Sequence, residues 1–311
     1  MCNRFELVAV NVSKGKGTPK IPVPEAFVDE RGIAGDAHAG RWHRQVSLLA
    51  VERIESFAKE MSREIGYGEF AENLTIRGLD TDRIAPLDRI IIGDVVLEAT
   101  QIGKSCHGSE CGIFKELGRC VMPKEGVFCR VRSPGRIHAG DAGRHEPRAL
   151  QVRIITSSDR VAAGVAEDRS GPRLRAILDE FFQPRRWHAQ ISAAVLPDDS
   201  ARLRAAIEEA RAGGVDALFI TGGTGVGPRD ITPETVMAAC DKTIPGIMEA
   251  IRMKTSASNP RALLSRSVAG VAGEMLVYAL PGSVRAVEEY MEGILPTMEH
   301  LFFMVRGIDV H

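Results

Sequence analysis

The 311-residue sequence has little net charge, a formal −1, and it lacks a long apolar run and any internal repeat. Its 40 basic and 41 acidic residues argue against nucleic acid or a membrane surface as the partner, because binding to either depends on a basic field. No apolar run reaches the ~18 to 20 residues that span a bilayer, and Arg4 and Glu6 lie where a signal peptide would begin its apolar core. We therefore expect a cytoplasmic protein whose partner is a small molecule.

Cysteine is sparse except in one stretch of the first half. Four of the six cysteines are Cys106, Cys111, Cys120 and Cys129, and the other two are Cys2 and Cys240. In a cytoplasmic chain such crowding indicates metal or sulfur chemistry before it indicates disulfides, although free cysteines are also often small buried hydrophobic residues. We expect this second role for Cys2, Cys129 and Cys240.

The chain is expected to divide near residues 140–149. The stretch from Gly140 to Pro147 is polar, contains glycine and ends in proline, and an apolar strand from Val152 to Ile155 follows it. Before this linker, short β-like runs alternate with turns, and only Val46 to Met61 has the pattern of a substantial helix. We expect a β-rich first domain over residues 1–145 and a second domain over residues 149–308.

The second half alternates between strand-like and helix-like segments. The expected strands are 152–156, 191–196, 217–221 and 275–280, and the expected helices are 171–182, 201–212 and 284–294. This alternation predicts a mostly parallel sheet flanked by helices, that is, a three-layer α/β/α domain. The protein as a whole is therefore expected to belong to the α/β class.

Polar residues follow each predicted strand of the second half. They are Ser157, Ser158 and Asp159 after the first strand, Pro197, Asp198 and Asp199 after the second, Thr221 to Gly225 after the third, and Pro281, Gly282 and Ser283 after the last. Ligands of an open parallel sheet bind beyond the carboxyl ends of its strands. We therefore expect the binding site where these four segments meet.

The turn from Thr221 to Gly225 suits an anion. Glycine accepts positive φ and brings no side chain, so successive backbone N–H groups can converge on a phosphate. Glycine turns also follow many strands for geometric reasons alone. The sequence contains neither a G-x-G-x-x-G motif nor the Lys-Ser or Lys-Thr pair of a Walker loop at the required spacing. The turn is a candidate phosphate site of another kind.

Two aspartates near these turns are candidate ligands for Mg2+. Thr232 and Pro233 have the pattern of a helix start, with Glu234 in the first turn. Asp230 lies outside that helix, and together with Asp198 it offers the one or two carboxylates that usually hold Mg2+ while phosphates and waters fill its other positions. A surface salt bridge is the alternative role for Asp230.

Six segments of the second half carry a resemblance. They are Asp168 to Arg173, Pro197 to Asp199, Thr221 to Gly225, Arg229 to Glu234, Leu264 to Gly270 and Leu280 to Ser283. In this order they resemble the MoaB/Mog family, whose domain also occurs in gephyrin and in the plant molybdenum-insertion protein. The likeness covers essentially all of the chain from Leu150 to Gly307.

The resemblance implies a role in molybdenum-cofactor biosynthesis. Active members bind molybdopterin and transfer AMP from Mg-ATP to its terminal phosphate, with release of pyrophosphate, and members of the Mog type usually form trimers. ATP, Mg2+ and molybdopterin or the molybdenum cofactor are the ligands implied here, and a homotrimer is the implied assembly. Such a transfer needs positioning and charge neutralisation more than a covalent nucleophile, which suits a site of aspartates and backbone amides.

Site residues follow from the matching positions. Asp198 and Asp230 are expected to be catalytic and to hold the metal and the nucleotide. The other residues expected to bind ligand are Ser158, Asp159, Asp168, Ser170, Gly222, Gly223, Thr224, Gly225, Arg229, Thr232, Glu234, Pro281 and Gly282, with Ser265, Arg266 and Ser267 at the pterin end. Glu274 departs from the family by placing a carboxylate near the expected pterin site, where it would weaken binding of a polyanion. The Arg229-Asp230 pair, which degraded members have lost, favours activity.

The first half carries a second resemblance. Its segments are Gly32 to Gly40, Arg44 to Leu49, Phe70 to Leu74, Ile92 to Asp94, Ile102 to His107 and Gly135 to Asp141. They resemble the MOSC domain, named for the C-terminal domain of molybdenum-cofactor sulfurases, over roughly Phe5 to Asp141. The resemblance implies a β-rich barrel that binds the molybdenum cofactor or carries sulfur on a cysteine.

Cys106 matches the position of that cysteine. Lys104 and His107 beside it would favour the thiolate, which is the form needed for persulfide or metal chemistry. The remaining residues expected to bind cofactor are Gly35, Asp36, His38, Arg44, Gln45 and Asn73. An alternative is a Zn2+ or iron–sulfur site formed by Cys106, His107, Cys111 and Cys120, although the spacing is not that of a standard zinc finger. His38 and His43 are expected to form hydrogen bonds or lie at the surface rather than to bind metal.

Three hypotheses join the two halves. In the leading one, the second domain adenylylates molybdopterin, and the first binds, sulfurates or delivers the cofactor, with fusion raising the effective concentration of the product. The second is a carrier that binds pterin without turnover. The third is a cofactor-dependent reductase of N-hydroxylated compounds. A molybdoenzyme or a sulfur-donor protein would be the protein partner, and no pyridoxal phosphate is expected.

Overall fold

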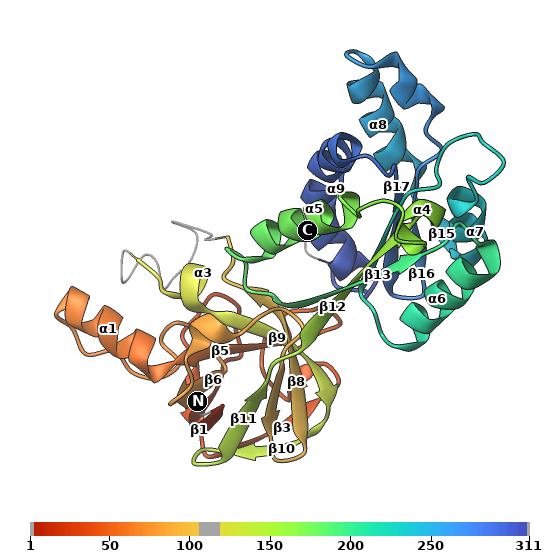
Figure 1. Cartoon of the computed structure of the whole chain (residues 1–311). Coiled ribbons are helices and arrows are strands. Elements are labelled where there is room, and N and C mark those ends of the chain that lie inside the picture. Colours follow the sequence, from red (N-terminus) through yellow and green to blue (C-terminus); the bar gives the residue numbers. More distant parts are fainter. Residues whose placement is uncertain (1–2, 106–118, 310–311) are drawn as a thin grey trace. The chain divides into compact units, whose positions relative to one another are not determined.

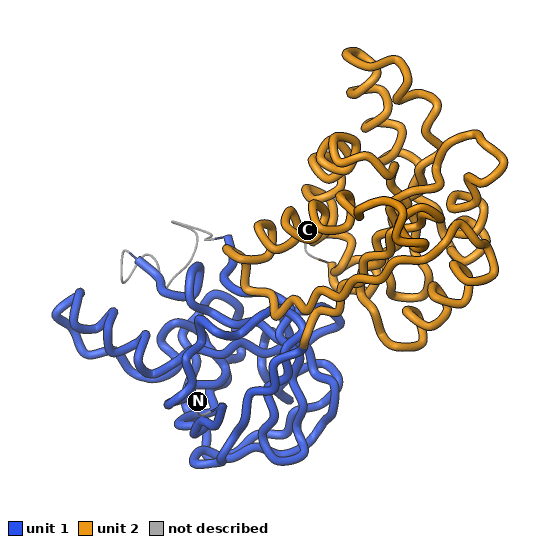
Figure 2. The backbone as a smooth tube through the Cα atoms, viewed as in Figure 1, with its two compact units in different colours: residues 1–148, 311 blue, residues 149–310 orange. Residues whose placement is uncertain are grey.

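The structure is a computed structural model that describes residues 3–105 and 119–309. The chain forms two compact units, unit 1 from Met1 to Arg148 and unit 2 from Ala149 to Val310 (Figure 2). Each unit has a hydrophobic core of its own. Within the described residues, no helix combines the length and the apolar character needed to cross a membrane.

Unit 1 contains a closed β-barrel, which confirms the β-rich barrel expected of the first half (Figure 1). Neighbouring strands around the ring are β1 (Arg4–Val12), β11 (Ala142–Glu146), β7 (Arg89–Ile92), β8 (Val95–Ile102), β9 (Val127–Ser133), β5 (Val46–Ala50) and β6 (Leu74–Arg77). The ring closes because β1 pairs with both β11 and β6. β2 (Ile21–Val23) pairs with β1, and a smaller sheet contains β3 (Glu25–Asp29), β4 (Gly32–Ile33) and β10 (Gly135–His138).

Buried side chains, which alternate with exposed ones along the strands, fill the interior of this barrel. In β1, Phe5 and Leu7 are buried, whereas Arg4 and Glu6 are exposed, as expected where every second residue faces the interior. Gly143 lies opposite Phe5, and a Cβ at this position would come within 2.2 Å of the Phe5 ring. A glycine on β11 therefore makes room for the largest side chain of β1.

The segment predicted as one helix from Val46 to Met61 contains two elements. Residues 46–50 form β5, and helix α1 (Val51–Met61) begins only after them. Every residue of β5 is buried, since the strand lies between β6 and β9 in the barrel wall. A short continuous apolar run fits a buried strand and a buried helix equally well, which is why the sequence pattern misplaced this boundary. The short elements η1 (Thr81–Arg83) and α3 (Met122–Glu125) complete the regular structure described in unit 1.

Unit 2 contains an α/β domain built on one sheet. The strand order across the sheet is β13 (His188–Leu196), β12 (Ala149–Ser157), β14 (Ala217–Thr221), β17 (Met275–Leu280), β16 (Val268–Ala272) and β15 (Lys242–Thr243). The first four strands are parallel, whereas β16 is antiparallel to both β17 and β15. The sheet is therefore mixed, and the expectation of a mostly parallel sheet is corrected.

The turn between β16 and β17 explains the antiparallel part. Only Gly273 and Glu274 separate the two strands, and Gly273 has a φ of 67°, which favours glycine. Two residues suffice for a hairpin, whereas a parallel connection needs a long crossover. The segment Val268 to Gly270, which the sequence assigned to a ligand-binding motif, is thus the start of a strand.

Helices cover both faces of this sheet (Figure 1). α6 (Ser200–Ala212) and α7 (Thr232–Ala239) lie on one face, and α5 (Ser170–Phe182), α8 (Pro245–Ser256) and α9 (Val284–Met304) lie on the other. Ile155, Ile220 and Val277 from three neighbouring strands pack with Leu203 and Ile207 of α6. Two short elements, α4 (Asp159–Ala162) and η3 (Pro260–Leu264), lie in the loops beside the sheet.

The register of the parallel strands brings four loops together. Ser157 of β12 pairs with Leu196 of β13, and Thr221 of β14 pairs with Leu280 of β17. Thr156 of β12 pairs with Thr221. The strands therefore end at the same edge of the sheet, and the segments that follow them lie side by side.

Candidate functional site

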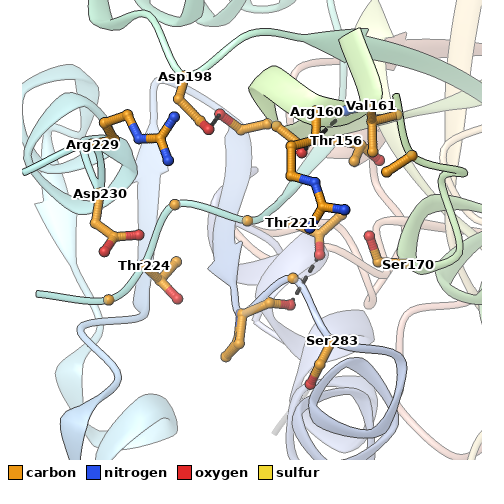
Figure 3. Close-up of a pocket in the computed structure, with 18 of the residues that line it drawn as sticks. Thr156, Arg160, Val161, Ser170, Asp198, Thr221, Thr224, Arg229, Asp230 and Ser283 are labelled. Carbon is orange, nitrogen blue, oxygen red and sulfur yellow. Dashed lines mark hydrogen bonds between the residues drawn. The ribbon is translucent and has the colours of Figure 1, made fainter. Parts of the chain in front are cut away.

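A cavity of about 1200 Å3 lies in unit 2 beyond the carboxyl ends of the parallel strands. Its walls come from the loops after β12, β13, β14 and β17 and from the start of α5 (Figure 3), together with η3. Of the residues expected from the sequence, those that line it are Ser158, Asp168, Ser170, Asp198, Gly222, Gly223, Thr224, Gly225, Arg229, Asp230, Ser265, Pro281 and Gly282. The structure thus brings together residues that are up to about 120 positions apart in the chain.

The glycine turn after β14 has the backbone that the sequence predicts. Gly222 has a φ of 109° and Gly223 a φ of 61°, both in the region that favours glycine. A Cβ at Gly222 would lie 2.2 Å from the carbonyl oxygen of Ser157, and one at Gly223 would lie 2.6 Å from Oγ1 of Thr232. The Gly222 amide donates to the Leu280 carbonyl at 2.9 Å. The turn is therefore packed tightly against the neighbouring strand ends.

Hydrogen bonds within the protein hold Asp198 in place. Ser157 Oγ donates to Asp198 Oδ1 at 2.9 Å, and the backbone N–H of Asp159 donates to Asp198 Oδ2 at 3.1 Å. In return, the backbone N–H of Asp198 donates to Asp159 Oδ1 at 3.0 Å. Asp159 itself does not line the cavity, so its role in this structure is to fix the loop that carries Asp198.

Asp230 lies beside the other end of the glycine turn. The Gly227 N–H donates to Asp230 Oδ2 at 2.8 Å, and the same oxygen lies 2.7 Å from the position that a Cβ on Gly225 would take. Oδ1 accepts no hydrogen bond from the described part of the chain. Arg229 contacts Asp159 Oδ2 at 3.3 Å through Nη1, which links this loop to α4. Figure 3 shows Asp198, Arg229 and Asp230 around the same cavity.

Asp168 organises the start of α5. Its Oδ1 accepts hydrogen bonds from the Gly171 N–H at 2.9 Å and from Ser170 Oγ at 3.3 Å, and its Oδ2 accepts from Thr156 Oγ1 at 2.8 Å. The carboxylate therefore ties the end of β12 to the first turn of the helix. A negative charge at a helix N-terminus is favourable. Asp168 thus lines the cavity and also stabilises the start of α5.

The loop before α9 forms the opposite wall. Thr221 Oγ1 donates to the Pro281 carbonyl at 2.9 Å, and Ser283 Oγ accepts from the Ala286 N–H at 3.2 Å as the N-cap of the helix. Gly282 approaches Gly222 so closely that a Cβ on Gly282 would lie 3.2 Å from the Gly222 Cα. The walls from β14 and β17 are therefore in direct contact.

Several residues expected to bind ligand lie outside the cavity lining. Thr232 is fully buried with a hydroxyl that has no hydrogen-bond partner among the described residues, and Glu234 forms an ion pair with Arg266. Arg266 donates to the carbonyls of Gly225 and Asp230, and Ser267 is buried with its Oγ 2.7 Å from Ser265 Oγ. The structure gives these residues contacts within the protein rather than a place on the cavity wall.

Glu274 lies far from the place expected for it. It occupies the turn before β17, and β17 pairs in parallel with β14 so that Leu276 lies opposite Ala217. Glu274 is therefore at the amino end of these strands, whereas Gly222 and Pro281 are at the carboxyl end. Its carboxylate lies 3.6 Å from Nε of Arg306. The expected conflict with a polyanion in the cavity does not arise.

The sequence reasoning missed three arginines of the cavity wall. Arg160 on α4, Arg169 before α5 and Arg261 on η3 all line it. Arg169 has an ion pair with Glu167 at 3.4 Å, whereas the guanidinium groups of Arg160 and Arg261 have no ion-pair partner in the described ranges. Figure 3 shows Arg160 reaching into the cavity. The position of Arg160 directly after Asp159, just beyond the end of a predicted strand, was the feature of the sequence that could have indicated its role.

In unit 1, the expected residues Asp36 and His38 form a cluster with Lys20. Lys20 Nζ lies 2.5 Å from Asp36 Oδ2 and 3.2 Å from His38 Nδ1, and the Ser13 N–H donates to Asp36 at 2.9 Å. Burial alone raises the pKa of Asp36, but hydrogen bonds from His38, Lys20 and Ser13 outweigh it and hold that pKa below its ordinary value. Burial lowers the pKa of Lys20. Lys20 itself was not foreseen.

The other expected residues of unit 1 have mainly structural contacts. Gln45 bonds to the carbonyls of Glu30 and Gly40 and accepts from the Val131 N–H at 2.6 Å, and Asn73 accepts from the Ser47 N–H at 3.1 Å. These two side chains join separate segments of the barrel. Two further residues remain candidates for ligand contact, namely Arg44, whose guanidinium lies 4.9 Å from the Trp42 ring centroid, and Gly35, which has a φ of 82°.

The cysteine hypotheses fall largely on residues outside the described ranges. Cys106, His107 and Cys111 belong to residues 106–118, so neither a sulfur-bearing Cys106 nor the alternative metal site has a structural description. His43 is buried with Nδ1 3.2 Å from Thr100 Oγ1. Cys129 lies in the barrel core, and burial raises its pKa, so it has the character of a small buried residue.

Comparison with known proteins matches the two halves to two families. Residues 153–300 match the model of a probable molybdopterin binding domain, and residues 35–143 match that of the MOSC domain. A molybdenum cofactor biosynthesis bifunctional protein of Synechococcus elongatus is 40% identical over 157 residues, which are 50% of this chain and 47% of that protein. The chain thus spans about half the length of this relative.

Shorter relatives are covered almost completely. A molybdopterin adenylyltransferase of Helicobacter pylori is 32% identical over 161 residues, which are 51% of this chain and 90% of that protein. A solved structure of MogA has 34% identity and a TM-score of 0.47, and the match covers 51% of this chain and 99% of MogA. With both resemblances confirmed, the chain belongs to the MoaB/Mog family of molybdopterin-binding domains and carries a MOSC domain ahead of it.

Proposed function

We propose that unit 2 transfers an adenylyl group from ATP to molybdopterin, as a step of molybdenum-cofactor biosynthesis. One observation carries this proposal. In the cavity beyond the carboxyl ends of the parallel strands, a glycine turn that suits phosphate lies between two aspartates, Asp198 and Asp230. Relatives named molybdopterin adenylyltransferase match nearly all of unit 2. The domain proposed for this activity comprises residues 149–308.

In the proposed reaction, an oxygen of the terminal phosphate of molybdopterin attacks the α-phosphorus of ATP. A bond forms between that oxygen and the α-phosphorus, the bond from the α-phosphorus to the bridging oxygen breaks, and pyrophosphate leaves with the electron pair. Such a transfer is promoted mainly by holding the reacting groups in line and by neutralising charge. The cavity offers both without a covalent nucleophile.

The glycine turn is proposed to hold phosphate. The Gly222 N–H is occupied by the Leu280 carbonyl, which leaves the amides of Gly223, Thr224 and Gly225 as the donors of the turn. Arg160 and Arg229 contribute positive charge at the cavity wall. Backbone amides held in place before the reaction stabilise developing negative charge without reorganisation. Arg169 and Arg261 extend the same positive field.

Asp198 and Asp230 fit a bound Mg2+. Both line the cavity, Asp198 next to Gly223 and Asp230 next to Gly225, and Asp198 is held in place by hydrogen bonds from Ser157 and Asp159. Mg2+ is usually held by one or two carboxylates, with phosphate oxygens and waters in its other positions. When bound, the ion would neutralise phosphate charge and orient the leaving group.

The pterin end is proposed to lie along Ser265 and η3. Ser265 lines the cavity, and its carbonyl and that of Ser267 accept hydrogen bonds from Arg252 Nη1 at 3.5 and 3.3 Å. Ser158, Ser170, Pro281 and Gly282 complete the walls within reach of a ligand. A homo-oligomer, with a trimer as the family precedent, remains part of the proposal, as do a molybdoenzyme or a sulfur donor as partner.

For unit 1 we propose binding, sulfuration or delivery of the cofactor. The described features that support contact with an anionic cofactor are the half-buried His38, which adjoins the buried Lys20–Asp36 pair, and the half-buried Arg44, which lies beside the exposed Trp42. The carrier hypothesis for unit 2 rested on Glu274, which the structure places at the other end of the strands. Adenylyl transfer is therefore the function that the geometry supports best, and no described contact favours the reductase.

The proposal is tested by molybdopterin-dependent release of pyrophosphate from ATP and Mg2+. Asp198→Asn and Asp230→Asn preserve shape while removing the charge of each carboxylate. We expect turnover in the wild type and a loss of at least about 100-fold in either variant. Asp199→Asn is the matched control, because Asp199 caps α6 by accepting from the Arg202 N–H and is not among the cavity residues. Wild-type binding of molybdopterin without turnover would contradict adenylyl transfer.

A further inference from the structure

Arg266 lies outside the cavity lining and contacts the end of the glycine turn and the loop that follows it. Its Nε donates to the Gly225 carbonyl at 2.6 Å, its Nη2 donates to the Asp230 carbonyl at 2.7 Å, and its Nη1 forms an ion pair with Glu234. The Arg266 backbone N–H also donates to the Thr224 carbonyl at 2.9 Å. One residue thus holds three points along the segment from Thr224 to Asp230 and a fourth on α7.

These contacts lie at both ends of an exposed loop. Residues 226–229 are exposed, whereas Gly225 and Asp230 on either side are half-buried. Within the loop, the Gly227 N–H bonds to the Asp230 side chain and the Asp230 N–H bonds to the Gly227 carbonyl at 3.0 Å. Those bonds shape the loop locally, and the contact of Arg229 Nη1 with Asp159 Oδ2 at 3.3 Å attaches its exposed part to α4. Arg266 attaches both ends of the loop to the segment that leads into β16.

Arginine is suited to this task in a way that lysine is not. The planar guanidinium presents five N–H donors in a fixed fork, so it can reach two carbonyls and a carboxylate at once. The ammonium of lysine is a point charge on a flexible stem and cannot span the same three acceptors. Because Arg266 is half-exposed, its ion pair with Glu234 contributes less than the two hydrogen bonds to carbonyl groups.

We propose that Arg266 is a positioning residue that fixes the Gly225–Asp230 loop, and with it the Asp230 carboxylate, against the glycine turn. This replaces the expectation that Arg266 faces the pterin, and it rests on the proposed function for its effect on turnover. Small displacements of a catalytic group slow a reaction strongly even when substrate binding is little changed. The loss should therefore appear in kcat, and the KM for molybdopterin should stay nearly constant.

The test compares full-length Arg266→Lys, Glu234→Gln and Arg211→Lys. Arg211 forms an exposed ion pair with Asp241 at 3.1 Å and lies on α6, so its replacement reports the general effect of losing a surface arginine pair. Glu234→Gln removes the ion pair of Arg266 but keeps its bonds to the two carbonyls. Hydrogen exchange of the peptide covering residues 222–231 measures the loop directly, and steady-state kinetics give kcat and KM separately.

For Arg266→Lys we expect hydrogen exchange of residues 225–230 to accelerate about tenfold or more. We also expect kcat to fall about 10- to 50-fold, while the KM for molybdopterin changes less than about threefold. Glu234→Gln should show a smaller change in the same direction, and Arg211→Lys should match the wild type. Unchanged exchange in Arg266→Lys, or a raised KM with kcat retained, overturns the proposal. If the wild type itself does not turn over, the proposed function fails, and the exchange data still decide whether Arg266 holds the loop.

Discussion

Asp159 and Asp198 exchange hydrogen bonds in both directions, each backbone N–H donating to the other side chain, at 3.1 and 3.0 Å. The two residues follow neighbouring strands and are 39 positions apart. Their reciprocal contact aligns the ends of β12 and β13 and turns the Asp198 carboxylate into the cavity. The position of a proposed metal ligand is thus set by a residue outside the cavity lining.

This relationship predicts the behaviour of Asp159→Ala. The substitution removes the acceptor for the Asp198 N–H and the partner of Arg229, so the Asp198 loop should loosen. We expect adenylyl transfer to fall about tenfold or more, with higher Mg2+ needed for half-maximal rate, because a misplaced ligand weakens metal binding. Asp159→Asn retains an acceptor oxygen and should recover most of the rate. Equal losses in both variants would show that charge, rather than the hydrogen bond, matters at residue 159.

A second prediction concerns the glycine turn. Gly222→Ala would place a Cβ 2.2 Å from the Ser157 carbonyl oxygen at a φ of 109°, so both strain and a clash with backbone oppose it. We expect a loss of more than about 3 kcal/mol in the unfolding free energy of unit 2, together with loss of activity. Gly214→Ala is the matched control, since Gly214 also has positive φ (71°) but its Cβ would meet nothing within 4 Å. Similar unfolding free energies for the two variants, measured by urea titration, would refute the clash.

A third prediction concerns Arg160, which the sequence patterns did not single out. Its guanidinium lines the cavity and has no ion-pair partner in the described ranges, so it is available to a ligand phosphate. Arg160→Gln should raise the KM for ATP or for molybdopterin about 5- to 20-fold and leave thermal stability nearly unchanged. Arg204→Gln, at an exposed position of α6, is the control. Unaltered KM values for both substrates would exclude a role for Arg160 in binding.

The fourth prediction concerns pH and unit 1. Glu72 is fully buried, and burial raises its pKa to about 6 from the ordinary 4.5, in spite of hydrogen bonds from the Gly68 N–H and Thr75. Because the folded pKa is raised, the carboxyl favours the folded state most below pH 4.5, and this contribution is lost as pH rises through 6. We expect about 2 kcal/mol of unit 1 stability to be lost through this group between pH 4.5 and pH 7.5.

Glu72→Gln should remove that loss. The variant is expected to show a flatter dependence of unfolding free energy on pH than the wild type, followed through urea-dependent hydrogen exchange of the β6 amides. Glu55→Gln, on the exposed face of α1, should leave the wild-type dependence unchanged. A wild-type slope that persists in Glu72→Gln would assign the pH dependence to another group.

The sequence predicted which loops line the cavity, because one simple rule fixes where those loops lie. Parallel strands end at one edge of a sheet, so Ser158, Asp198, Gly223 and Pro281 had to meet once the strand–helix alternation was recognised. No distance between them was needed for that inference. The glycine turn likewise followed from local conformational requirements alone.

The errors arose where a residue's place depends on long-range packing. Val46 to Ala50 has a pattern that fits either a helix or a buried strand, and only its neighbours in the barrel decide. The family resemblance placed Glu274 near the pterin site, whereas the β16–β17 hairpin carries it to the other end of the sheet. The contacts of Arg266 depend on a loop 36 to 41 residues away, which no local pattern reveals.

The central claim is best tested with ATP labelled at the α-phosphorus, incubated with molybdopterin, Mg2+ and the full-length protein. The account predicts that the label appears on the pterin as an adenylyl group, with stoichiometric pyrophosphate, and that neither Asp198→Asn nor Asp230→Asn transfers it at more than about one hundredth of the wild-type rate. The account would be contradicted if the label stayed with ATP, or if both variants transferred it as fast as the wild type.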